Sequence, residues 1–164
     1  MANICVLVAD AAKARLFTLE AADMPDVQSG PNLIERDGLA NPEGAMPGRD
    51  KYSDVHSGRT TSGGGTVHGV DDHRNRHDAE NERRFAVKIV DEATRLATQQ
   101  KAWQLVVVAE KQMLGVLRQA FGSGSKPFEI RELAKNLANF SPSDIHSHLA
   151  DEKILPAHRR AKIG

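Results

Sequence analysis

The stretch 85-FAVKIVDEATRLATQQKAWQLVVVAE-110 decides the fold that we predict for this chain of 164 residues. Its first part places apolar residues at the spacing of one helical face, namely at Phe85, Ala86, Ile89, Ala93, Leu96 and Ala97. Its second part, Trp103 to Glu110, is a run of apolar and β-branched residues that is typical of a strand buried on both faces. A helix followed at once by a buried strand favours an α/β domain.

Three further strands are predicted on the amino-terminal side of this stretch. Ile4 to Asp10 is short and β-branched, Ala12 to Glu20 follows after a tight connection, and Asn32 to Asp37 lies between SGP and GLANPEG. Because short turns separate them, we expect an antiparallel meander.

On the carboxyl side, Met113 to Gly122 predicts a short helix and Phe128 to Leu133 a last strand. A final helix begins at Ser141, a good N-cap, with Pro142 at the first helical position and Asp144 completing a capping box. The resulting order β-β-β-α-β-α-β-α is that of a ribonuclease H-like mixed sheet, although fold alone does not determine function.

The segment 38–78 has no apolar periodicity and is rich in Gly, Pro, Ser, Asp and His. About forty such residues exceed an ordinary connection, so we predict a long mobile loop before the first long helix. The predicted organisation is one domain over residues 1–150, including this loop, and a basic tail over 151–164.

Composition and charge argue against a protein that is basic overall, a disulfide-bonded protein and a membrane protein. Lys and Arg number 22, as do Asp and Glu, so any affinity for nucleic acid has to be local. The one cysteine, Cys5, lies in an apolar run and indicates a buried inert thiol in a reducing compartment. The amino terminus does not have the pattern of a secretory signal and no apolar run is long enough for a membrane span, so we expect a cytoplasmic protein.

The loop contains three consecutive glycines, Gly63, Gly64 and Gly65, within 62-SGGGTVHGVDDHRNRHDAENERRF-85. Such a run is either a flexible tether or a place where backbone N–H groups approach a ligand closely. It does not match a phosphate-binding P-loop or the GxGxxG pattern.

Histidines and carboxylates follow the glycines. A pair at i and i+4, His73 with His77, suits zinc or iron when a carboxylate completes the set. The ligand set is incomplete, with neither HExxH nor a cysteine partner, so we predict no metal and no cofactor. The residues weighed for this site are His68, His73, His77, Asp71, Asp72 and Asp78.

Arginines surround the glycines and are partly offset by acidic neighbours. Guanidinium groups on a Gly-rich loop suit contacts with a phosphate backbone. The predicted RNA-binding set is Arg59, Gly63, Gly64, Gly65, His68, Arg74, Arg76, Arg83 and Arg84.

Two carboxylates suggest a different chemistry. Asp10 ends the first predicted strand and Glu110 ends the central one, and these strands are neighbours in a ribonuclease H-like sheet. Paired carboxylates there could hold Mg²⁺ for phosphodiester hydrolysis. The simpler interpretation is that both are polar residues at strand ends, with Asp10 forming a turn.

Several motifs in order resemble the bacterial family named "protein required for attachment to host cells". They are VLVADAAKARLF, GGGTVH, HDAENERRFAVKIVDEA, LVVVAEKQMLGVLRQAF and LAKNLANFSPSDIHSHL, spread over residues 3 to 150. That family is in turn similar to the middle domain of archaeo-eukaryotic peptide-chain release factors and Pelota. The resemblance implies a ribonuclease H-like fold and a ribosome- or RNA-associated module.

In release factors a Gly-Gly-Gln loop precedes a long helix and enters the peptidyl-transferase centre. Here no glutamine follows the glycines, since Thr66 and Val67 come next. Gly64, Gly65 and His68 are therefore only weak catalytic candidates, and peptidyl-tRNA hydrolysis is not expected.

Three functional hypotheses result. The leading one is a ribosome- or tRNA-binding module that acts on stalled or idle ribosomes through its Gly-rich loop. The second is a Mg²⁺-dependent nuclease that uses Asp10 and Glu110. The third is an interaction protein that supports attachment to host cells indirectly. The sequence leaves the oligomeric state open.

Overall fold

The computed structural model describes residues 4–24, 27–42 and 66–160, with the helical backbone alone from 66 to 77. The element order is β1 (Ile4–Ala9), β2 (Lys13–Glu20), β3 (Asn32–Ala40), α3 (Thr66–Gln99), β4 (Gln104–Ala109), α4 (Lys111–Phe121), β5 (Glu129–Ala134) and α5 (Pro142–Asp151). The predicted α/β class is confirmed, with one five-stranded mixed sheet and three helices within these residues.

The strands lie in the order β3-β2-β1-β4-β5. β2 is antiparallel to both of its neighbours, whereas β4 is parallel to β1 and to β5. The register places Val8 beside Val108, so β1 and β4 end at the same edge of the sheet. This edge is where Asp10 and Glu110 follow their strands.

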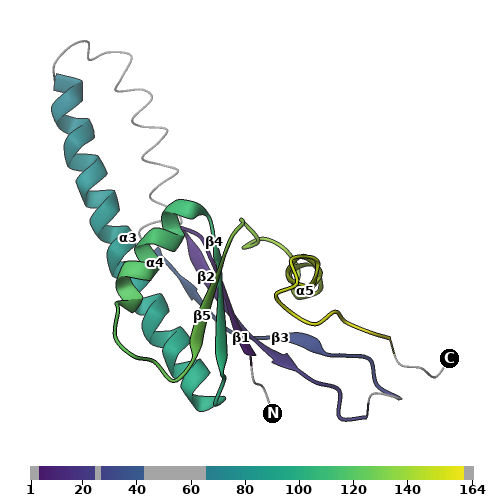
Figure 1. Ribbon diagram of the computed structural model, residues 1–164. Coiled ribbons are helices and arrows are strands. Elements are labelled where there is room, and N and C mark those ends of the chain that lie inside the picture. The colour runs from purple at the N-terminus through teal and green to yellow at the C-terminus, as the bar shows by residue number, and fades with distance from the viewer. Residues whose placement is uncertain (1–3, 25–26, 43–65, 161–164) are drawn as a thin grey trace.

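Helices cover both faces of the sheet (Figure 1). On one face α3 and α4 pack through Phe85, Ile89 and Leu117 against β1, β2 and β4. On the other face the short α5 packs through Ile145 and Leu149 onto the opposite sides of the same strands. β1 and β4 are apolar apart from Gln104 at the start of β4, because both of their faces are buried under helices.

Two helices end in the same way. After α3, the N–H of Ala102 bonds to Ala97 O and the N–H of Lys101 bonds to Thr98 O, with Lys101 at φ 53°. After α5, Ile154 bonds to Leu149 O in the same pattern, and Lys153 is at φ 61°. Both are Schellman motifs with a lysine at the left-handed position that glycine usually occupies. Each motif turns the chain back so that the next apolar residue is buried.

The predicted limits of several segments differ from the structure. The strand predicted to end at Asp37 continues to Ala40, where β3 still pairs with β2. The predicted loop 38–78 is also helical from Thr66 onward, because α3 begins twelve residues before Asp78. The part of that prediction that concerns 43–65 lies outside the described residues.

The predicted boundary at residue 150 also differs, because the fold continues beyond it. Ile154 and Leu155 are buried in the same cluster as α5. Arg159 then forms a β-bridge with Gly30, and the His158 ring contacts Pro31 O. The described part of the predicted tail therefore packs on the domain as far as Arg159.

Candidate functional site

The amino-terminal half of α3 forms an arm that extends past α4 and the sheet (Figure 1). The helix has 34 residues, and Phe85 is the first of its described side chains to be buried. The turns before Phe85 correspond to about 28 Å of helix at 1.5 Å per residue. The arm begins at Thr66, directly after the three glycines of the sequence.

Some of the predicted RNA-binding residues belong to this arm, and others lie outside the described residues. Arg59 and the glycines 63–65 lie outside the described residues. His68, Arg74 and Arg76 belong to the α3 backbone, and their side chains lie outside the described part.

Arg83 and Arg84 lie at the base of the arm and face solvent. Their side chains are 66% and 59% exposed. Both guanidinium groups are near the Glu80 carboxylate, at 3.8 and 3.6 Å, which is longer than a hydrogen bond. Exposed pairs of this kind are weak, so these two arginines remain able to contact an anionic partner.

The residues weighed for a metal lie almost entirely outside the described side chains. Asp78 is exposed on α3, and the side chains of the other five residues are outside the described part. Among the described residues, no three His, Cys, Asp or Glu side chains are grouped as a metal would require.

The Asp10 carboxylate has a structural role in a turn. Its Oδ1 accepts hydrogen bonds from the N–H groups of Ala12 and Lys13, both at 2.8 Å. The N–H of Asp10 bonds to Lys13 O and closes the β1–β2 turn. Glu110 is the exposed N-cap residue of α4, and its side chain makes no capping bond. The two residues follow neighbouring parallel strands, as predicted, and Asp10 already uses one oxygen as a turn former.

A third carboxylate lies near the start of α4. Glu82 of α3 pairs with the Gln112 side chain at 3.5 Å, at the upper limit of a hydrogen bond. Partial burial raises the pKa of Glu82 above its ordinary value, the bond from Gln112 lowers it, and the charge of Asp78 raises it. This contact joins the base of the arm to the sheet edge where Glu110 lies.

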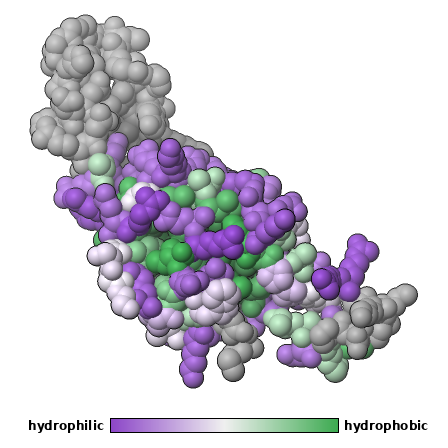
Figure 2. Space-filling view, in the orientation of Figure 1, coloured by the Kyte–Doolittle hydropathy of each residue, from purple (hydrophilic) through white to green (hydrophobic). Residues whose placement is uncertain are grey.

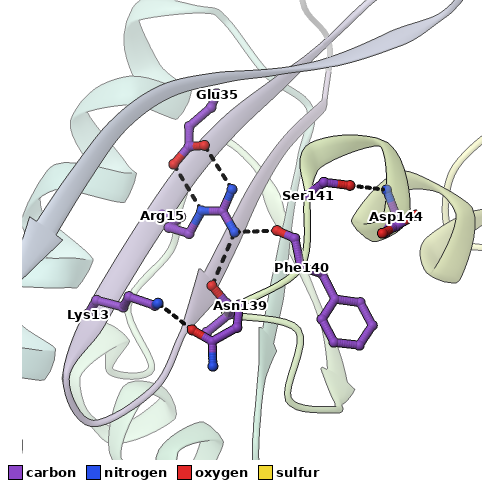
Figure 3. Close-up of polar contacts among 8 residues, drawn as sticks. Lys13, Arg15, Glu35, Asn139, Phe140, Ser141 and Asp144 are labelled. Atoms are coloured by element: carbon purple, nitrogen blue, oxygen red, sulfur yellow. Dashed lines mark hydrogen bonds and ion pairs between the residues drawn. The ribbon is translucent and has the colours of Figure 1, made fainter.

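A polar cluster that the sequence analysis did not identify lies on the α5 side of the sheet (Figure 3). The guanidinium of Arg15 donates two hydrogen bonds to Glu35, at 2.9 and 2.8 Å. Its Nη1 also donates to Ala138 O at 3.1 Å and to Phe140 O at 2.5 Å. Lys13 of the same strand donates to the Asn139 side chain.

This cluster, which we call the Arg15 clamp (Lys13, Arg15, Glu35 and residues 138–140), joins β2 and β3 to the loop before α5. Ser141 follows the clamp, and its Oγ accepts a bond from the N–H of Asp144. The predicted N-cap of α5 is thereby confirmed. The pKa of Glu35 is held below its ordinary value, chiefly by the hydrogen bonds from Arg15. No local sequence pattern indicates the clamp, because Arg15 is more than 120 residues from the two carbonyls to which it donates.

The structure is that of an α/β domain with a helical arm, and none of its described helices is long and apolar enough to cross a membrane. A family model described as "protein required for attachment to host cells" matches residues 5–149. The chain belongs to this family, as the sequence motifs predicted. No curated protein matches the chain.

Proposed function

We propose that this member of the attachment family is a cytoplasmic binding module that contacts a ribosome or a tRNA through the α3 arm. The observation that supports this most is the position of the arm. It projects from the domain and begins at Thr66, directly after Gly63, Gly64 and Gly65. A projecting element that follows a glycine run is suited to reach into a partner rather than to complete a core.

The element order supports a ribonuclease H-like domain similar to the middle domain of release factors. Three antiparallel strands come first, and β4 and β5 are then added in parallel. Because no glutamine follows the glycines, the proposed activity is binding to the ribosome or tRNA rather than peptidyl-tRNA hydrolysis. Stalled or idle ribosomes are the proposed targets.

The arginines of the arm are the proposed phosphate contacts. Arg83 and Arg84 are exposed and only weakly paired with Glu80. Phosphate contacts position a protein on nucleic acid without reading its sequence, and they release counterions. Binding should therefore weaken steeply as salt is raised.

Co-sedimentation of the full chain with purified ribosomes tests this function. Replacing Arg83 and Arg84 together with Gln should weaken binding and reduce the slope of log affinity against log salt by about two, one for each lost phosphate contact. Deleting residues 57–70 should weaken binding as well. The matched control is Arg118→Gln, because Arg118 is 65% exposed on α4, away from the arm. Ribosome binding that neither change to the arm affects would contradict the proposal.

A second candidate is the nuclease, because Asp10 and Glu110 follow neighbouring parallel strands. This proposal predicts RNA cleavage that EDTA abolishes and that Asp10→Asn abolishes while the domain stays folded. Cleavage that survives both treatments would exclude a metal-dependent reaction at this position.

A further inference from the structure

An exposed aromatic side chain lies beside the Arg15 clamp. On the face of the molecule that Figure 2 shows, hydrophilic residues surround a hydrophobic area. Among the described residues, six large hydrophobic side chains are exposed, and two of these, Phe140 and Trp103, are aromatic. Phe140 is 39% exposed and directly precedes the N-cap of α5. In proteins that bind RNA, exposed aromatic rings are where unpaired bases stack.

The backbone of Phe140 is held in place through both its N–H and its carbonyl. The N–H bonds to Leu137 O at 3.1 Å, and the carbonyl accepts from Arg15 at 2.5 Å. In Figure 3 the Phe140 ring points away from the Arg15 guanidinium. The ring is thus presented outward on an ordered backbone, which lowers the entropic cost of binding a ligand.

The Phe140 ring lies against the last turn of α5. Its centroid is 5.1 Å from that of the His148 ring, and the two ring planes are tilted by 53°. Asp144 is four residues before His148, so both side chains lie on the same side of the helix. The aromatic surface and the Asp144 carboxylate therefore belong to one side of α5.

Two polar side chains near the ring have groups available for hydrogen bonds. The exposed Asn139 accepts from the Lys13 ammonium through Oδ1, and an ammonium only donates, so the Nδ2 group points away from Lys13 (Figure 3). Asp144 is exposed and uses its backbone N–H in the N-cap. Within the described residues, no hydrogen bond of Asn139 Nδ2 or of the Asp144 carboxylate was found. A donor group and an acceptor group are therefore available near the ring.

The charges near the ring do not favour a phosphate group. Glu35 neutralises Arg15 through two hydrogen bonds. Of the other charged residues in the clamp, the β1–β2 turn and the first turn of α5, Lys13 is basic whereas Asp10 and Asp144 are acidic. A ligand here is recognised through a flat uncharged surface and its hydrogen-bonding edge rather than through ion pairs.

We infer that Phe140 is a stacking position for an unpaired base of the RNA that this protein contacts. The base stacks on the exposed face of the Phe140 ring, and its polar edge bonds to Asn139 Nδ2 or to the Asp144 carboxylate. This inference rests on the proposed function, because it takes the partner to be the RNA of a ribosome or a tRNA. It adds a contact on the α5 face of the sheet, opposite to the face that α3 covers.

An unpaired base suits this position better than an apolar side chain of a partner protein. The other five exposed large hydrophobic residues belong to the β2–β3 connection, β3, α3 and the position before β4, and none belongs to the clamp or to α5. A protein interface centres on a group of apolar residues. A stacked base needs only one aromatic ring with polar groups at its edge.

Nuclear magnetic resonance of the full chain with adenosine tests the stacking directly. Adenosine carries no phosphate, so its binding does not depend on the arm. We expect the ring signals of Phe140 and His148 and the side-chain amide of Asn139 to shift as adenosine is added, whereas equal concentrations of ribose should shift none of them. Trp103 is the internal control, because it is the more exposed aromatic ring, at 52%, and precedes β4. Shifts of equal size at Trp103, or none at Phe140, would overturn the inference.

Substitution of Phe140 tests the contact with the whole partner. Phe140→Leu should weaken co-sedimentation with ribosomes on the order of tenfold. It should leave the slope of log affinity against log salt unchanged, because the lost contact is not ionic. Phe140→Tyr keeps the ring and should bind like the native chain, and Trp103→Leu is the matched control. Circular dichroism of each variant checks that the fold is intact.

These results separate the stacking position from the proposed function. Native affinity of Phe140→Leu, or an equal loss in Phe140→Tyr, overturns the stacking contact even when the arginine variant of the arm loses binding. If the native chain does not co-sediment with ribosomes, the proposed function fails, and the adenosine titration alone decides whether Phe140 binds a base.

Discussion

Replacing Arg15 with Met tests whether the Arg15 clamp stabilises the domain. The Arg15 guanidinium lies 5.1 Å from the Phe17 ring centroid, and a methionine would keep an apolar side chain over that ring. The substitution removes the four hydrogen bonds to Glu35, Ala138 O and Phe140 O. It therefore separates the polar contribution of this side chain from its packing.

The expected loss follows from these contacts. Each of the two carbonyl bonds contributes about 1 kcal/mol, since the acceptors are partly accessible to water. Arg15 is 16% exposed but Glu35 is 38% exposed, so the ion pair, discounted for screening, adds about 0.5–1 kcal/mol. The free energy of unfolding should thus fall by about 2–3 kcal/mol in total, which lowers Tm by about 5–10 °C for a chain of this length.

Urea unfolding, followed by circular dichroism and Trp103 fluorescence, measures this loss. The matched control is Arg118→Met. Arg118 also pairs with a glutamate, Glu132, through two hydrogen bonds of 3.1 and 2.6 Å. Its side chain is 65% exposed, and both of its hydrogen bonds within the described residues go to Glu132 and none to a carbonyl. The control should lose less than about 1 kcal/mol. If both variants lose the same amount, the bonds to the loop before α5 contribute nothing and the reasoning is refuted.

The pH dependence supplies a second check. Arg15 lowers the pKa of Glu35 in the folded protein below its ordinary value of 4.5. A carboxylate with a lowered folded pKa stabilises the protein at pH above 4.5, and this contribution is lost as pH falls through the folded pKa. The stability difference between the native chain and Arg15→Met should therefore shrink below pH 4.5. A difference that does not change with pH would exclude Glu35 from the clamp.

Three further predictions follow from single residues. Lys153→Gly should raise the free energy of unfolding by about 0.5–1 kcal/mol, because Lys153 has φ 61° at the end of α5, whereas Lys153→Ala should bring no gain in urea unfolding. Ser141→Ala should lower the free energy of unfolding by about 1 kcal/mol through loss of the N-cap. The control Ser143→Ala, at an exposed position in the first turn of α5, should change this free energy little, and equal losses would contradict the cap. Cys5 should resist iodoacetamide at pH 8 until the chain unfolds, because burial, and then the charge of Glu20, raises its pKa to about 11; rapid alkylation of the native protein, followed by mass spectrometry, would contradict this.

The strands were predictable because their apolar patterns are local. Ile4 to Ala9 and Gln104 to Ala109 are buried along their whole length or nearly so, and runs of this kind are distinctive in the sequence. The buried state of Cys5 was predicted for the same reason and is confirmed. The carboxyl-terminal part of α3 was predicted from its stripe of Phe85 to Ala97.

The start of α3 was missed because the sequence of residues 66–78 has no apolar periodicity. Residues 66–78 contain Gly69 and many polar residues, so no periodicity separates them from a loop. The packing of residues 154–159 was also missed, since Ile154 and Leu155 are isolated apolar residues among charged neighbours.

The sequence by itself determined the α/β class, the order of the described elements and the family, because each depends on patterns within a short window. Only the tertiary structure decided which polar residues meet. It joined Arg15 to Glu35 and to a loop far along the chain, and it brought Glu82 of α3 to Gln112 near the start of α4. These contacts depend on strand order and register, which arise from the packing of the whole sheet between its helices and leave no local signal in the sequence.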